Sequence, residues 1–194
     1  MRIFLAGATG VLGSRLTRLL IADGHSVVGI TRSRARVDAL STMGAEAMVC
    51  DVFDAAALSD AVVAAAPDVV MHQLTDLPDA AADLDAAAGA ANARIRRQGT
   101  HNLLAAAIAA GVTRVFAQSV AWPLEGDSAA AVADLERMVT DARGVVLRYG
   151  RFYGPGTYHP DSLPDIPRVH IDTAAALTVA ALATTSHLLT IVDD

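Results

Sequence analysis

The chain has 194 residues, of which 53% are hydrophobic and 4% aromatic, so it suits one domain with a core of Ala, Val, Leu and Ile. A net charge of −6 argues against a general role at nucleic acids or membrane surfaces, and the longest apolar stretches are too short for a membrane span. All fifteen basic residues are arginine, which excludes a Schiff-base lysine, and the lone Cys50 excludes an internal disulfide and suits a reducing cytoplasm.

The first fifteen residues carry the most specific local pattern. A short apolar strand, Ile3–Ala6, runs directly into glycines spaced Gly7-x-x-Gly10-x-x-Gly13, and an amphipathic helix follows over residues 11–23. Gly7 would allow a tight turn, Gly10 would let the backbone approach phosphate oxygens, and Gly13 would let the helix pack against the sheet. Because the unpaired N–H groups at a helix start attract anions, the pattern predicts a pyrophosphate-binding turn.

Strand-like and helix-like segments alternate to the end of the chain. Near-continuous apolar runs, typical of parallel strands covered on both faces, mark seven strands: Ile3–Ala6, Ser26–Thr31, Ala45–Cys50, Asp68–His72, Arg114–Ser119, Val145–Tyr149 and Leu188–Val192. Helices are expected over residues 11–23, 34–42, 55–65, 87–110, 129–142 and 172–184. Asp54 and Asp172 are expected N-caps, and Leu12, Leu16, Leu19 and Leu20 form the buried face of the first helix.

This alternation predicts an α/β fold, a Rossmann-like doubly wound parallel sheet of about seven strands with helices on both faces. Residues 1–194 are expected to form a single NAD(P)-binding domain. The stretch from residue 153 to 168 holds four prolines and two glycines, so we expect it to be irregular.

Further motifs, taken with the glycine turn, resemble the extended short-chain dehydrogenase/reductase superfamily, the NAD-dependent epimerase/dehydratase group. They cover nearly the whole chain and comprise Asp51-Val52, His72-Gln73-Leu74, Gly99-Thr100, the run Arg114–Ser119, Leu147-Arg148, Tyr153-Gly-Pro-Gly156 and Val169-His170-Ile-Asp172. The resemblance implies cofactor contacts by Gly7, Thr9, Gly10, Val11, Leu12, Gly13, Asp51, Val52, His72, Gln73 and Leu74. Helix capping is the alternative role for Asp51, and a structural role is the alternative for His72.

The segment after the second strand bears on the choice of cofactor. In this fold an acidic residue about 20 positions past the glycines binds the ribose 2′-hydroxyl and marks NAD. Here the chain reads Thr31-Arg32-Ser33-Arg34-Ala35-Arg36, without a carboxylate. Because a guanidinium binds a phosphate through two parallel hydrogen bonds, Arg32 and Ser33 favour NADP over NAD. The alternative is a solvated helix start with Ser33 as N-cap.

The family's usual catalytic pair, Tyr-x-x-x-Lys, is missing. Alignment on Leu135-Glu136 places its two positions at Ser128 and Val132, and the sequence contains no lysine. The catalytic candidates that remain are Ser119, which matches the family's hydroxyl near the end of the fifth strand, and Tyr153 of the Tyr-Gly-Pro element. Hydrogen bonding to nearby backbone and simple packing are their respective alternatives. Only thirteen residues separate Gly156 from His170, so the substrate-binding region around residues 154–170 is strongly shortened.

These observations predict an NADP(H)-binding atypical short-chain dehydrogenase/reductase, an oxidoreductase or epimerase-like enzyme acting on a small molecule in the cytoplasm. The alternative is a non-catalytic NADP(H)-binding sensor, regulatory or scaffold protein. No metal-ligand spacing is present. We expect neither a nucleic-acid nor a membrane partner. The resemblance implies a homodimer through the helices at residues 87–110 and 129–142.

Overall fold

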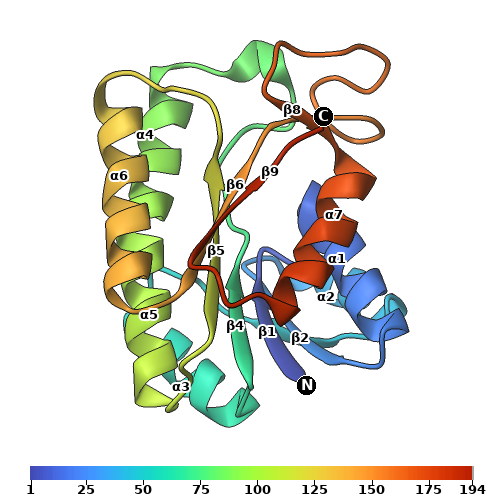
Figure 1. The fold of residues 1–194 in the computed structure, drawn as a ribbon. Helices are drawn as coiled ribbons and strands as arrows, with labels where there is room; N and C mark the ends of the chain where they lie inside the picture. The colour runs from blue at the N-terminus through green and yellow to red at the C-terminus, as the bar shows by residue number, and fades with distance from the viewer. Residues whose placement is uncertain (194) are drawn as a thin grey trace.

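A seven-stranded parallel sheet runs through the middle of the molecule, and helices cover both of its faces (Figure 1). The computed structural model describes residues 1–193. The strand order is β3-β2-β1-β4-β5-β6-β9. The strands are β1 (Arg2–Ala6), β2 (Ser26–Thr31), β3 (Glu46–Val49), β4 (Val69–His72), β5 (Val115–Val120), β6 (Val145–Tyr149) and β9 (Leu188–Ile191). The predicted fold class is confirmed, because the apolar runs form the strands as expected; the central strands are buried, whereas the edge strands β3 and β9 are partly exposed.

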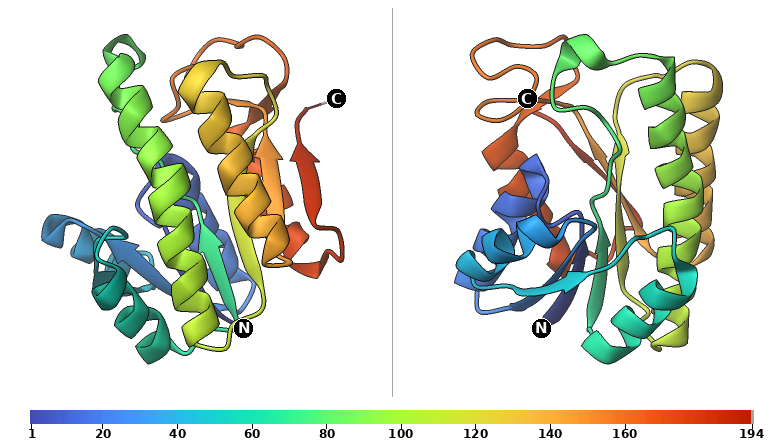
Figure 2. Two further views of the ribbon diagram at one scale, coloured as in Figure 1. Left: turned by 90° about the vertical axis from the view of Figure 1, so that its left-hand side faces the viewer. Right: turned by 180° about the vertical axis from the view of Figure 1, so that it is seen from behind.

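The helices form two layers with separate apolar cores. One layer contains α3 (Ala55–Ala65), α4 (Ala86–Arg94), α5 (Thr100–Ala109) and α6 (Gly126–Asp141); the other contains α1 (Val11–Ala22), α2 (Val37–Thr42) and α7 (Ile171–Ala180). A π-helical segment, Ile95–Gly99, joins α4 to α5, so the helix predicted over residues 87–110 is one continuous rod (Figure 2). Short 3-10 turns lie at Arg34–Arg36, Ala81–Asp83 and Ala181–Ala183.

A second, two-stranded parallel sheet was not predicted. It pairs β7 (Arg151–Tyr153) with β8 (Arg168–His170), and Tyr153 lies opposite His170. These strands bracket the proline-rich stretch, and residues 154–167 between them are irregular, as expected. Three residues are too few to show an apolar alternation in sequence, so only the tertiary fold reveals this pairing.

Three details of the predicted helices also differ. Asp54 caps α3 as expected, its side chain accepting a hydrogen bond from the Ala57 N–H, but the N-cap of α7 is His170 and not Asp172. Ser33 stands at the N-cap position of the following 3-10 turn, where its hydroxyl makes no capping hydrogen bond. Leu19 was expected in the core and is 39% exposed, because α1 presents only Leu12, Leu16 and Leu20 to the sheet.

The strand order singles out one end of the sheet. β1 is flanked by β2 on one side and by β4 on the other, so the chain leaves the centre of the sheet in two directions. Ala6, the last residue of β1, is in register with both Ile30 and His72. In doubly wound sheets ligands bind at such a switch point, beyond the carboxyl ends of the strands. The turn that begins at Gly7 occupies this place.

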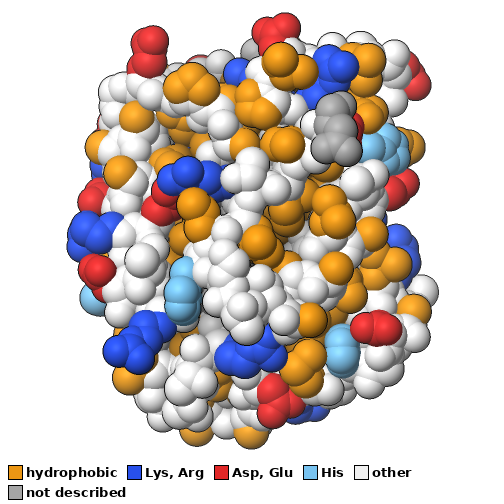
Figure 3. Space-filling view, in the orientation of Figure 1, with side chains coloured by type: hydrophobic (Ala, Val, Ile, Leu, Met, Phe, Trp, Pro, Cys, Tyr) orange, Lys and Arg blue, Asp and Glu red, His pale blue; other side chains and the backbone are white. Residues whose placement is uncertain are grey.

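The outer surface of the helices is of mixed character. On the face shown in Figure 3, arginine side chains are separated from one another by acidic, hydrophobic and neutral ones. Within residues 1–193, no helix is both long and apolar enough to cross a membrane.

Two leucines of α1 allow a matched test of this packing. Leu16 is fully buried and Leu19 is 39% exposed. Leu16→Ala is expected to lower the free energy of unfolding by about 2–5 kcal/mol, since it leaves a cavity against the sheet. Leu19→Ala is expected to lower it by about 1 kcal/mol or less. Urea denaturation followed by circular dichroism measures both, and equal losses would contradict the assignment of the buried face.

Candidate dinucleotide-binding site

Close backbone contacts require the glycines of the turn. Gly7 has φ of 94°, and a Cβ there would lie 2.5 Å from the carbonyl oxygen of Gln73, just past the end of β4. A Cβ at Gly13 would lie 2.0 Å from the Gly7 carbonyl oxygen, so this glycine lets the first turn of α1 close onto the loop before it. Neither position admits another residue without movement of the backbone.

The start of α1 is open to an anion. Its N-cap is Gly10, which has no side chain to cap the helix, and the first turn holds no acidic residue. A Cβ built on Gly10 would meet only the Gly7 carbonyl, at 3.3 Å, within 4 Å. The N–H groups of the first turn and the positive end of the helix dipole therefore suit a phosphate group.

A cavity of about 370 Å³ extends from this turn between the ends of β2 and β4. Eight of the thirteen predicted cofactor residues line it: Gly7, Thr9, Gly10, Arg32, Ser33, Val52, Gln73 and Leu74. Val11, Leu12 and Gly13 form the first turn of α1, with the Leu12 side chain in the core. Asp51 lies at the exposed end of β3, where its carboxylate accepts a hydrogen bond from the Phe53 N–H at 3.0 Å. Within residues 1–193, no group of His, Cys, Asp and Glu side chains is arranged to hold a metal ion.

His72 does not line this cavity. Its ring is buried, with Nδ1 accepting a hydrogen bond from the Leu74 N–H at 3.2 Å and Nε2 lying 3.1 Å from the Thr100 hydroxyl. Since Nδ1 is an acceptor, Nε2 carries the proton in the neutral ring. Burial, together with the nearby charge of Arg96, lowers the pKa of His72 to about 4. This geometry fits the structural role that is the alternative for His72.

The side chain of Gln73 lies at the end of a chain of hydrogen bonds that begins at Thr178. Thr178 donates its hydroxyl proton to the Ala174 carbonyl at 2.6 Å, so Tyr149 must donate to Thr178, at 2.7 Å, and Gln73 Nε2 donates to Tyr149, at 3.4 Å. This chain of donors fixes the amide orientation and leaves Gln73 Oε1 buried without a hydrogen-bond partner in the described part of the chain. A buried, unpaired oxygen on a residue that lines a cavity suits a donor group on a bound ligand.

Two arginines give the cavity a positive wall. Arg32 Nη2 lies 3.0 Å from a carboxylate oxygen of Asp76, and Arg36 Nη1 donates to the Thr9 hydroxyl at 3.4 Å. Arg36 was not among the predicted cofactor residues; its position four residues after Arg32, on a 3-10 turn, brings both to the same wall. Ser33 lines the cavity between them, whereas Arg34 does not.

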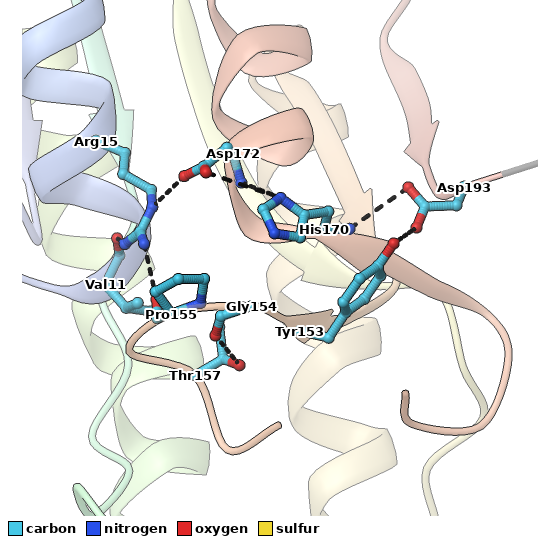
Figure 4. Close-up of polar contacts among 9 residues, drawn as sticks. All are labelled: Val11, Arg15, Tyr153, Gly154, Pro155, Thr157, His170, Asp172 and Asp193. Carbon is cyan, nitrogen blue, oxygen red and sulfur yellow. Dashed lines mark hydrogen bonds and ion pairs between the residues drawn. The ribbon is translucent and has the colours of Figure 1, made fainter. Parts of the chain in front are cut away.

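The two predicted catalytic residues are engaged elsewhere. Ser119 donates its hydroxyl proton to Glu136 at 2.6 Å, and Arg148 binds the same carboxylate through two hydrogen bonds of 2.8 and 2.5 Å. Tyr153 donates to Asp193 at 2.6 Å (Figure 4), and this hydrogen bond raises the pKa of its phenol. The structure does not place Ser119 or Tyr153 on the cavity wall.

All three tyrosines of the chain donate their hydroxyl proton to an acceptor within the protein. Tyr149 donates to Thr178 and Tyr158 donates to the Pro78 carbonyl at 2.5 Å, while Tyr153 donates to Asp193. Burial raises the pKa of Tyr149 and of Tyr158 as well. Each phenolic proton is thus held by an acceptor within the protein.

Arg15 anchors the shortened region beside the glycine turn, a role that the sequence analysis missed. Its guanidinium donates to the carbonyls of Val11 and Pro155, at 2.9 and 2.7 Å, and pairs with Asp172 at 2.6 Å (Figure 4). α1, α7 and the loop after β7 therefore meet at one side chain. In sequence the only signal was an arginine off the apolar face of the helix.

The Glu136 carboxylate has a pH-dependent role in stability. Burial opposes its charge, but hydrogen bonds from Arg148 and Ser119 outweigh burial and lower the pKa of Glu136. A depressed carboxylate pKa adds stability above the unfolded value of about 4.3, and this contribution is lost as the pH falls through the folded value. Because Arg148 is partly exposed, Glu136→Gln should cost about 1 kcal/mol at pH 7.

The difference between wild type and Glu136→Gln in urea denaturation should shrink between pH 5 and pH 3. Glu125→Gln is the matched control, since that glutamate is exposed and its side chain makes no capping hydrogen bond. If the free energy of unfolding lost in Glu136→Gln stays constant over this pH range, the substitution acts through side-chain shape and not through charge.

Comparisons with known proteins identify the family. The model of the NAD dependent epimerase/dehydratase family matches residues 3–136. A 3-diazoavenalumate denitrifying reductase from Streptomyces sp is 41% identical over 181 residues, covering 81% of this chain and 58% of the reductase. An uncharacterized protein of Mycobacterium tuberculosis is 31% identical over 194 residues, covering 95% of this chain and 20% of that protein. The chain thus spans little more than half of the first relative and a fifth of the second.

Solved structures show the same fold. The UDP-glucose 4-epimerase of Thermus thermophilus, in complex with NAD, superimposes with a TM-score of 0.80 at 18% identity, over 99% of this chain and 78% of the epimerase. A short-chain dehydrogenase from Streptomyces avermitilis gives a TM-score of 0.73 at 17% identity, over 98% of this chain and 87% of that one. With the family model spanning the glycine turn, the central strands and most of α6, this chain belongs to the NAD-dependent epimerase/dehydratase family.

Proposed function

We propose that this protein is an NADP(H)-dependent reductase whose substrate needs no proton from a tyrosine side chain. The observation that carries the proposal is that the tyrosine hydroxyl groups are already hydrogen-bonded within the protein. All three tyrosines donate to acceptors within the protein, and Ser128 and Val132 stand where the family's Tyr and Lys are expected. A carbonyl substrate would need a proton donor at its oxygen, and no tyrosine of this chain is free for that role.

The cavity residues fit a dinucleotide. The first turn of α1 would hold the pyrophosphate, because its N–H groups are uncapped and the close contacts at Gly7 and Gly13 bring the backbone to the cavity. Gln73 Oε1 would accept a hydrogen bond from the ligand, which would satisfy a buried acceptor. Val52 would pack against the adenine ring from the cavity wall.

The positive wall supports NADP(H) over NAD(H). Arg32 and Arg36 would bind the 2′-phosphate through charge-assisted hydrogen bonds, with the Ser33 and Thr9 hydroxyls beside them. When bound, the reduced nicotinamide supplies a hydride.

The relative's name suggests a matching reaction. A denitrifying reductase of a diazo compound removes nitrogen, and we propose a small diazo-substituted molecule as the substrate class here. In its diazonium form the carbon–nitrogen bond breaks, the bonding pair leaves with dinitrogen, and a carbon–hydrogen bond forms with the delivered hydride. The charges balance without any proton from the protein, so the engaged tyrosines are no obstacle.

A non-catalytic NADP(H)-binding protein is the second candidate. The short segment between Gly156 and His170 favours it, because little chain is left to cover a nicotinamide from water. The predicted homodimer and the cytoplasmic location stay predictions in either case.

Cofactor binding tests the first half of the proposal. Calorimetry should show NADPH binding the wild type more tightly than NADH. Arg32→Ala is expected to weaken the binding of NADPH about ten-fold or more, since a charge-assisted hydrogen bond is lost. Arg34→Ala is the matched control, removing the same charge from a residue outside the cavity, and should change little. Equal losses in both variants, or a preference for NADH, would contradict the proposed 2′-phosphate site.

Turnover tests the second half. With 3-diazoavenalumate as probe, we expect NADPH oxidation together with release of dinitrogen, and deuterium from NADPH labelled at C4 should appear in the product. Tyr153→Phe should keep most of this turnover. A loss of about 100-fold or more, the usual contribution of a general acid, would show that Tyr153 supplies a proton after all. NADPH binding without any turnover would support the second candidate.

A further inference from the structure

We propose that Asp76 is a specificity-determining residue, a built-in carboxylate that competes with the cofactor's 2′-phosphate for Arg32. The inference rests on the proposed function, in which Arg32 binds that phosphate. It assigns a function to a residue that the sequence analysis did not single out. Asp76 would lower the affinity for NADPH relative to the affinity for NADH.

The ion pair joins the two segments that flank the glycine turn. Arg32 follows β2, and Asp76 follows β4, the two strands on either side of β1. Arg32 Nη2 and Asp76 Oδ1 are 3.0 Å apart. Since neighbouring strands lie about 4.8 Å apart, a bridge between β2 and β4 must reach across about 10 Å at the end of β1, where the cavity opens. Arg32 lines the cavity, and so does Thr75, the residue before Asp76, so a ligand in the cavity lies beside this pair.

Asp76 is the fixed partner and Arg32 the free one. The Asp76 N–H donates to the side-chain oxygen of buried Asn92 at 3.2 Å, and two residues earlier the Leu74 carbonyl accepts a hydrogen bond from Gln118 at 3.1 Å. The side chain of Asp76 is 31% exposed, whereas that of Arg32 is 55% exposed. The carboxylate thus stays where its backbone holds it, while the long arginine side chain has room to turn toward a ligand.

A carboxylate and a phosphate present the same kind of oxygen acceptor to a guanidinium. Binding of NADPH would transfer Arg32 from Asp76 to the 2′-phosphate and leave two anions near one another. NADH has no such phosphate, so the Arg32–Asp76 pair would persist in its complex. The acid therefore opposes binding of the phosphorylated cofactor and is neutral toward the other.

Calorimetric titration of Asp76→Asn with NADPH and with NADH tests this inference. Because the pair is partly exposed, removal of the charge should tighten the binding of NADPH by roughly five-fold, and added salt should reduce this gain in affinity. The affinity for NADH should stay unchanged. Asp83→Asn, which removes an equal charge from an exposed residue of the same loop, should alter neither affinity. Thermal unfolding of each variant checks that the fold is kept.

The Arg32→Ala background separates the mechanism from a general effect of charge. There Asp76→Asn should leave NADPH affinity unchanged, since the competition needs the guanidinium. A gain that persists in this background, or weaker binding of both cofactors by Asp76→Asn alone, would overturn the inference. If the wild type binds NADPH and Asp76→Asn binds it no better, only this inference fails. If the wild type binds neither cofactor, the proposed function fails and the inference fails with it.

Discussion

The backbone contact between Gly7 and Gln73 is the constraint on which the site depends. The Gln73 N–H donates to the Ala6 carbonyl at 2.8 Å, so β4 pairs with β1 as far as the start of the turn. A Cβ at Gly7 would lie 2.5 Å from the Gln73 carbonyl oxygen, and one at Gly13 would collide with Gly7 itself. Only glycine allows both approaches, and together they set where α1 begins and aim its first turn at the cavity.

Because the chain contains no lysine, arginine side chains make the ion pairs that lysine or arginine can make in other proteins. Arg15 holds three parts of the fold together beside the turn, Arg148 fixes Glu136 against β5, and Arg97 ties the π-helical segment to Asp127 and Asp134 of α6. A guanidinium offers up to five donors in a planar fork, so one side chain can satisfy several carbonyl and carboxylate oxygens at once. On the cavity wall Arg32 donates to Asp76 and Arg36 donates to Thr9, and a ligand can compete for both guanidinium groups.

Much of the site could be predicted, and the failures share one cause. Gly7, Gly10, Arg32, Ser33 and Val52 line the cavity because motif spacing and strand ends determine which backbone reaches it. His72 follows the same rule for its backbone, but its ring turns into the core and binds Thr100. Ser119 and Tyr153 likewise lie near strand ends, yet their hydroxyls bind Glu136 and Asp193. Sequence spacing predicts position along a strand, whereas side-chain direction depends on partners far away in the chain.

The sequence by itself determined the fold class, the approximate strand and helix bounds and the position of the glycine turn. Continuous apolar runs and glycine spacing are local properties, and they specify local structure directly. Only the tertiary structure decided which polar groups are free. It paired β7 with β8, engaged all three tyrosines, left Gln73 Oε1 without a partner in residues 1–193 and set Asp76 against Arg32, 44 residues away. The physical reason is that hydrogen bonds and ion pairs act over a few ångströms, and long-range packing alone brings such groups together.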